Sequence, residues 1–316
     1  MREKNIQKLF NQYIAECEYT RDLRPATIWG YKNCFHLFQK LVPNIETTDQ
    51  LSPAVLTEFF EILSTRKRIV GKNTEKVGIK GSTKIGYWRR LNSFFKWMVI
   101  RGSIEQNHLK DIKPAAPVYE DLKVLKRHHI DKMIAAIKLN SKNSFLEKRD
   151  MAILFTLFFC GIRKGELLSL RVQDISLKGK NPTLTINGAT SKSRSTRKIP
   201  INRRLISPLQ DYIEERKRKK YKSEFFWVSS LNDARLTSFG LKHWVDRLKK
   251  SSGVKFHLHQ FRHTFTCALD EKNVSASKIQ KLLGHSDLRM TQRYLRSTRP
   301  EDLRDEINSL SIDILI

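Results

Sequence analysis

We predict a mainly α-helical protein of two domains, with a small antiparallel β-sheet in the second domain. Three observations predict this fold class. Apolar residues recur at helical spacing through the first third of the chain. The segment DIKPAAPVYEDLK follows, and its paired prolines are typical of a linker between domains. Further along, two short runs of β-type residues, TLTIN and RKIPI, flank a polar turn.

The first three helices are expected within residues 6–63. The first carries an apolar stripe over residues 6–17, and the second begins near RPAT with a stripe over residues 28–41. The third begins at LSPAVL, where Ser52 is placed to cap the helix and Pro53 to occupy its first position.

The segment that follows, residues 66–81, is basic and punctuated by glycines, and we expect a loop there. A fourth helix is expected from about Ser82 to Arg101. Its apolar residues form one buried face, and a set of cations lies on another face. That second face could enter a DNA major groove or be exposed to solvent. These candidate DNA-binding residues are Lys84, Arg89, Arg90 and Lys96.

Four segments follow from this reading. An N-terminal helical domain covers residues 1–112, a linker residues 113–122, the second domain residues 123–300 and a C-terminal tail residues 301–316. The second domain is expected to contain six helices and the two β-type runs, with VQDIS as a possible third strand. The expected helices span residues 128–139, 146–160, 204–218, 238–250, 261–271 and 275–283.

The charge of the chain indicates a polyanionic partner. Its 60 Lys and Arg residues against 32 Asp and Glu residues give a formal net charge of +28. Nucleic acid is the first candidate and an anionic membrane the second. The longest apolar run, MAILFTLFFCGI, is shorter than the ~20 residues that span a bilayer. No secretory signal is visible, so we expect a cytoplasmic, nucleoid-associated protein without a membrane partner.

Several kinds of site are absent from the sequence. There is no GxxxxGK[ST] phosphate-binding loop, no GxGxxG motif after a strand and no acidic cluster typical of a two-metal nuclease. The four cysteines form no CxxC pair, and we expect free thiols and no zinc site. An enzyme acting on DNA with this chain must therefore use cationic side chains on the phosphate.

Several residues in the second domain carry such chemistry. Each has a structural alternative: Arg163 can pair with Glu166, Lys192 can be one more surface lysine, and the histidines can be core or cap residues. His259 and Arg262 are three apart and so share a helical face. The candidates are Arg163, Lys192, His259, Arg262, His285 and Tyr294.

Three motifs resemble the signature boxes of the tyrosine recombinases, also called phage integrases. They are GIRKGELLSL, HLHQFRHTF and LLGHSDLRMTQRYL. The resemblance covers essentially the whole chain. It implies an N-terminal helical, SAM-like core-binding domain and an α+β tyrosine recombinase catalytic domain, which together clamp DNA.

The resemblance also implies roles for the candidates. Arg163, Lys192, His259, Arg262, His285 and Tyr294 form the implied catalytic set. The family's usual Gly-Lys-Gly turn is replaced here by TSKSRS, so Arg194 or Arg197 is an alternative to Lys192 near the phosphate, and both are candidate DNA-binding residues.

The implied reaction is cleavage and rejoining of DNA strands through a 3′-phosphotyrosine, without metal, ATP or another cofactor. The implied partners are duplex DNA with a specific recombination site, a homo-tetramer on two such sites and accessory DNA-bending proteins. Integration or excision of a mobile element is the favoured role. Xer-like dimer resolution, topoisomerase-like relaxation and a non-catalytic DNA-binding regulator are the alternatives.

Overall fold

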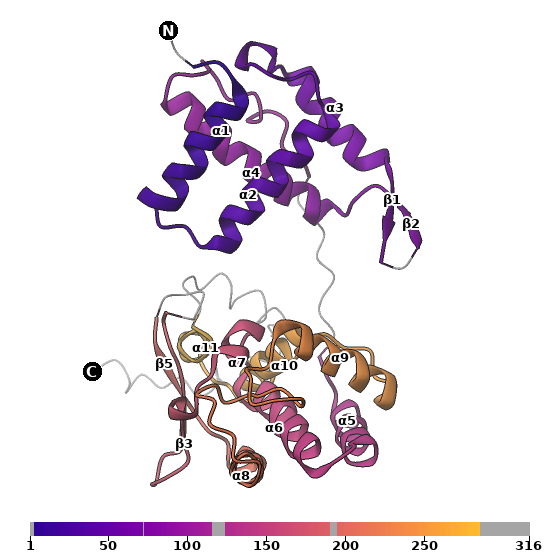
Figure 1. Cartoon of the computed structure of the whole chain (residues 1–316), viewed down its shortest axis with the longest axis vertical. Helices are drawn as coiled ribbons and strands as arrows, with labels where there is room; N and C mark the ends of the chain where they lie inside the picture. The colour runs from indigo at the N-terminus through magenta and orange to yellow at the C-terminus, as the bar shows by residue number, and fades with distance from the viewer. Residues whose placement is uncertain (1–2, 72, 116–123, 190–194, 285–316) are drawn as a thin grey trace, which may run out of the picture. The chain divides into compact units, whose positions relative to one another are not determined.

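The computed structural model describes residues 3–71, 73–115, 124–189 and 195–284. The chain divides into two compact units, Met1–Glu120 and Asp121–Ile316 (Figure 1). Each unit has its own hydrophobic core.

The first unit is a bundle of four helices. Proline occupies the start of two of them, where its missing N–H costs no helical hydrogen bond. The side chain of Ser52 accepts a hydrogen bond from the Val55 N–H, which confirms the expected cap. The helices are α1 (Ile6–Ala15), which continues as a π-helical turn (Glu16–Thr20), α2 (Pro25–Leu41), α3 (Pro53–Thr65) and α4 (Gly81–Ile100).

Aromatic rings fill the core of this bundle. Phe10 of α1 stacks on Phe35 of α2 with ring centroids 3.9 Å apart. Phe94 of α4 meets Phe10 edge-on at 5.2 Å. Such pairs add to the stabilisation that burial alone provides, and they tie three helices together.

The expected loop at residues 66–81 is wrong. The structure has an antiparallel hairpin there, with β1 (Lys67–Val70) paired to β2 (Thr74–Val77). All residues of the two strands are exposed or half-buried, so the usual alternation of apolar and polar residues is missing from the sequence. Asn73 adopts a left-handed φ of 60°, as hairpin turns require.

The second unit packs helices around α6 (Ser144–Cys160). Helices α5, α8 and α10 all contact it (Figure 1). The other helices are α5 (Arg127–Asn140), α7 (Lys164–Ser169), α8 (Arg203–Arg218), α9 (Ser238–Ser252), α10 (Leu258–Asp270) and α11 (Ala276–Leu283). All six predicted helices are present. Helix α7 was not predicted, because its six residues are too few to show a helical spacing of apolar residues.

A three-stranded antiparallel sheet lies beside α11. Its order is β3 (Ile175–Ser176), β4 (Thr183–Ile186) and β5 (Arg197–Pro200). The register pairs Thr183 with Pro200 and Ile186 with Arg197. The predicted third strand is confirmed only at its end, because residues 172–174 form a 3-10 turn.

The mainly α fold with small antiparallel sheets is therefore confirmed. All four cysteines are free thiols, as expected. Among the described residues, no helix is long and apolar enough to cross a membrane.

Candidate functional site

Arg163 lies where α6 gives way to α7. Gly161 ends α6 in a left-handed conformation, and Arg163 is the residue that caps α7. Its side chain is 22% exposed. The buried helix α6 therefore delivers a guanidinium to the edge of the core.

Glu166 joins Arg163 to a second arginine, Arg197 of β5. Glu166 Oε1 accepts from Arg163 Nη1 at 2.9 Å, and Oε2 accepts from the Arg163 backbone N–H at 2.9 Å. Arg197 donates from Nη1 at 3.1 Å and from Nη2 at 2.8 Å, one bond to each oxygen. This two-pronged geometry holds both partners in a fixed orientation.

The Glu166 carboxylate is 2% exposed. Burial raises its pKa, but the hydrogen bonds from Arg197 and from the Arg163 backbone outweigh burial and hold the pKa below its usual value. Glu166 is therefore ionised at neutral pH and supplies a fixed negative charge between the two arginines.

Arg262 approaches the same place from α10. It is 1% exposed, and its Nη1 donates to the Gly161 carbonyl at 3.0 Å. Its Nη2 donates to the Leu283 carbonyl at 2.8 Å, and Arg163 Nη1 lies 3.5 Å from that same oxygen. The two arginines therefore converge on one carbonyl at the end of α11.

Arg197 fixes the preceding carbonyl of α11. Its Nε donates to Leu282 O at 2.7 Å. Gly284, the next described residue after Leu283, has a φ of +62°, and an added Cβ there would lie 2.8 Å from Arg197 Nη1. Only glycine fits this close approach without strain. The arginine cluster, Arg163, Arg197 and Arg262, thus holds the C-terminal end of α11.

The charges of this cluster do not balance. Glu166 bonds to Arg163 and Arg197, whereas Arg262 bonds to the carbonyls of Gly161 and Leu283. The three guanidiniums therefore bring more fixed positive charge to the site, next to the half-buried Arg163, than Glu166 brings negative charge. Arginine stays charged at any physiological pH and presents forked N–H donors. A phosphate oxygen is the kind of group that such an arrangement binds.

His259 lies on the first turn of α10, three residues before Arg262. The residue is exposed, yet the protein around its ring lowers its pKa. Desolvation is the largest cause, and the positive charge of Arg262 adds to it. The ring is therefore neutral at pH 7, and a neutral imidazole can accept a proton.

Four of the predicted site residues lie outside the described residues. They are Lys192, Arg194, His285 and Tyr294. The predicted C-terminal tail, residues 301–316, also lies outside them. The structure brings together Arg163, His259 and Arg262, and Gly284, the last described residue, precedes His285 in the sequence.

Arg197, predicted as a DNA contact and as an alternative to Lys192 near the phosphate, is buried in the structure. Its side chain is 8% exposed and is occupied by Glu166 and Leu282. From the sequence, Glu166 is expected only as a structural partner of Arg163. The spacing of Arg163 and Glu166, three residues apart at a helix start, was the available signal for its role.

In the first unit, the cations predicted to bind DNA lie on one helix, α4. Arg89, Arg90 and Lys96 are exposed, whereas Lys84 is half-buried beside a cavity of about 320 Å³. The guanidinium of Arg90 covers Gly30, where an added Cβ would lie 3.1 Å from its Nε. The positions of these side chains are compatible with contact to a phosphate backbone.

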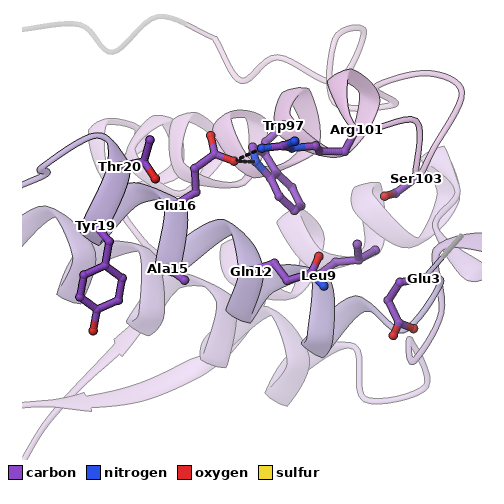
Figure 2. Close-up of a pocket in the computed structure, with 10 residues that line it drawn as sticks. All are labelled: Glu3, Leu9, Gln12, Ala15, Glu16, Tyr19, Thr20, Trp97, Arg101 and Ser103. Atoms are coloured by element: carbon purple, nitrogen blue, oxygen red, sulfur yellow. Dashed lines mark hydrogen bonds and ion pairs between the residues drawn. The ribbon is translucent and has the colours of Figure 1, made fainter.

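A second cavity of about 580 Å³ in the first unit has the opposite character (Figure 2). Glu3 and Glu16 line it, and Figure 2 shows the Glu16 carboxylate bonded to Trp97 and Arg101. Hydrogen bonds from Arg101, Trp97 and Arg21 lower the pKa of Glu16 to about 2. Arg101 also lines the cavity but is paired with Glu16, and Glu3 adds a further negative charge, so this cavity is not a candidate nucleic-acid site. Across the described residues, no group of three or more His, Cys, Asp or Glu side chains could hold a metal ion.

Comparison with known proteins points to one family. The model described as Phage integrase family matches residues 123–301. Tyrosine recombinase XerD of Listeria monocytogenes serovar 1/2a is 26% identical over 302 residues, covering 93% of this chain and 95% of the relative. A tyrosine recombinase of Pseudothermotoga lettingae is 29% identical over 309 residues, covering 97% and 98%.

Solved structures share the fold. The Tn1549 transposon integrase in complex with a circular intermediate DNA has a TM-score of 0.75 and 17% identity, covering 98% of this chain and 100% of its own. The XerH site-specific recombinase bound to its difH substrate has a TM-score of 0.67 and 19% identity, covering 95% and 84%.

Proposed function

Because the chain belongs to the phage integrase family of site-specific DNA recombinases, we propose that it cleaves and rejoins DNA through a covalent bond between Tyr294 and a 3′-phosphate. The observation that carries this proposal is the arginine cluster, in which Arg163 and Arg262 converge on Leu283 O, two residues before His285 in the sequence.

In this reaction the phenolic oxygen of Tyr294 attacks the phosphorus and displaces the 5′-oxygen of the next nucleotide. A 5′-hydroxyl from the partner duplex later attacks the phosphotyrosine and joins a new pair of strands. Each step exchanges one phosphate ester for another, so the bond energy is conserved and no ATP is consumed.

The transition state places additional negative charge on the phosphate oxygens. Arg163 and Arg262 supply fixed positive groups for those oxygens, and Glu166 keeps Arg163 in place. Preorganised donors of this kind contribute most of the rate in many enzymes, and the loss of one costs ~100–1000-fold. His285 is assigned as a further donor to a phosphate oxygen.

Two proton transfers accompany the exchange. A phenol is mostly protonated at neutral pH and is then a weak nucleophile. His259, whose lowered pKa leaves it neutral, is assigned as the proton acceptor. Lys192 is assigned as the proton donor to the departing 5′-oxygen, which leaves poorly as an alkoxide. These groups perform the reaction without a metal ion, so cleavage is expected to persist in EDTA.

For the biological role, we propose integration or excision of a mobile element on duplex DNA with a specific site. The likeness to the fold of the Tn1549 transposon integrase supports this role. The relatives named XerD and XerC support the second candidate, resolution of chromosome or plasmid dimers, equally well. The protein would act in the cytoplasm as a tetramer on two sites, together with DNA-bending proteins. Residues 301–316 would dock on a neighbouring subunit, and deletion of residues 303–316 should then abolish pairing of the two sites.

The test is a covalent trap. The full chain is incubated in EDTA with end-labelled duplexes from its own genomic neighbourhood, and SDS stops the reaction. We expect an adduct that Tyr294→Phe abolishes and Tyr19→Phe, a matched change at an exposed ring, leaves intact. Adduct formation by the Tyr294→Phe protein, or its loss on chelation, would refute the assignment. Two further assays distinguish the roles: integration of a circular donor DNA supports the mobile-element role, and resolution of a plasmid dimer supports the second candidate.

A further inference from the structure

The β1–β2 hairpin contributes little to its own unit. Figure 1 shows it extending away from the end of α3. Ile69 and Val77 are 75% and 66% exposed, and among the described residues none from 67–77 belongs to the hydrophobic core. A two-stranded ribbon gains little stability from its own packing, and the exposed faces of this one are free to contact a partner.

The base of the hairpin is fixed. The Gly78 N–H donates to the Arg66 carbonyl at 2.9 Å, and Arg68 Nε donates to the Gly78 carbonyl at 2.6 Å. Arg66 in turn donates from its N–H to the Ile62 carbonyl of α3. The ribbon is therefore held in a defined direction at the end of a core helix.

The two faces of the ribbon differ in charge. On one face, Lys67 and Glu75 form an ion pair of 3.1 Å. On the other face, Arg68 lies directly opposite Lys76 in the register. Like charges opposite each other destabilise a ribbon. An anion bound against this pair would remove the repulsion.

We propose that the Arg68–Lys76 face of the hairpin binds the phosphate backbone of duplex DNA. This inference rests on the proposed function and adds to it a DNA contact from outside the helical bundle. A two-stranded ribbon also has the width that a major groove admits. Over residues 66–80, the only carboxylate is Glu75, whereas the cations are Arg66, Lys67, Arg68, Lys72, Lys76 and Lys80.

A second copy of this chain is the less suitable occupant. Each copy has a net charge of +28, and pairing two hairpins would bring their cations together. DNA instead satisfies the cations directly. Every phosphate contact releases condensed counterions, which makes binding weaken as salt rises.

The test measures DNA affinity against salt. Fluorescence anisotropy on a labelled recombination-site duplex is recorded from 50 to 200 mM salt with the full chain. Arg68→Gln combined with Lys76→Gln should make the slope of log K against log salt shallower by about 1 to 2, because each lost phosphate contact removes about 0.9. Binding at 50 mM salt should weaken at least about tenfold.

Two further variants control this result. Lys217→Gln with Lys219→Gln removes the same charge from two exposed residues at the C-terminal end of α8, where Lys219 follows the last helical residue, and it should leave the slope nearly unchanged. Glu75→Gln removes the hairpin's carboxylate and should tighten binding. The proposal would be overturned if the Arg68/Lys76 variant had the same salt slope as the wild type. It would also be overturned if the α8 variant lost as much affinity as the Arg68/Lys76 variant.

Failure of this inference can be told from failure of the proposed function. If the wild-type protein forms the Tyr294 adduct and the hairpin variants bind DNA normally, the hairpin contact is refuted and the recombinase mechanism stands. Absence of the adduct in the wild-type protein refutes the recombinase mechanism. Self-association without DNA that Ile69→Ser abolishes would assign the hairpin to a second copy and overturn the DNA contact.

Discussion

The pairing of Arg197 with Glu166 permits a quantitative prediction. Replacing Arg197 with Met keeps an unbranched side chain but removes the three hydrogen bonds that the guanidinium donates to Glu166 and to the Leu282 carbonyl. Glu166 loses two bonds, of 3.1 and 2.8 Å, and the Leu282 carbonyl loses one of 2.7 Å. Removing one member of a buried ion pair typically costs ~3–5 kcal/mol, because the other charge is left without compensation.

Arg163 still contacts Glu166 in this variant, so the cost should stay within that range although the Leu282 carbonyl is also left unsatisfied. In a unit of this size ~1 kcal/mol changes Tm by ~2–4 °C, so we expect a decrease of ~6–20 °C. Calorimetry on the full chain measures it, with Arg204→Met as the exposed control on α8.

A double-mutant cycle makes the test specific. Combining Arg197→Met with Glu166→Gln should cost ~1–3 kcal/mol less than the sum of the single changes, because the two side chains interact directly. An Arg197→Met protein within ~0.5 kcal/mol of the Arg204→Met control would refute the reasoning, since that is the usual effect of a surface change.

Three other predictions concern the same site. Arg262→Lys keeps the charge but loses the fork that bonds two carbonyls, and adduct formation should slow ~100-fold or more, measured as a single-turnover rate. His259 must be neutral to accept a proton, and its pKa is lowered; the rate should therefore fall with decreasing pH at a midpoint below 6.5, and a midpoint above 6.5 would contradict its role. Gly284→Ala should destabilise the protein more than Gly253→Ala, because both have a positive φ but only the first Cβ meets a neighbour; chemical denaturation compares the two.

The sequence predicted the helices well because their apolar spacing is set by one buried face. It failed at residues 67–77, where both faces of the hairpin are in solvent and the spacing carries no information. It also missed α7, which is too short to show a period.

For the site, the motifs pointed to Arg163 and Arg262, which the structure brings to one carbonyl. The motifs did not distinguish Arg197 from the other cations of the basic turn. Its role depends on a carboxylate 31 residues away and a carbonyl 85 residues away, and such distant pairings cannot be deduced from local spacing.

The excess of arginine over carboxylate has a practical consequence for handling the protein. Sulfate is a tetrahedral anion, so its shape and negative charge complement the arginine cluster. A ligand that binds only the folded protein raises the melting temperature of that protein by mass action. The purified protein should therefore melt at a higher temperature in sulfate than in chloride of equal ionic strength. The same anion would compete with substrate, so a buffer chosen to keep the protein intact would slow its reaction.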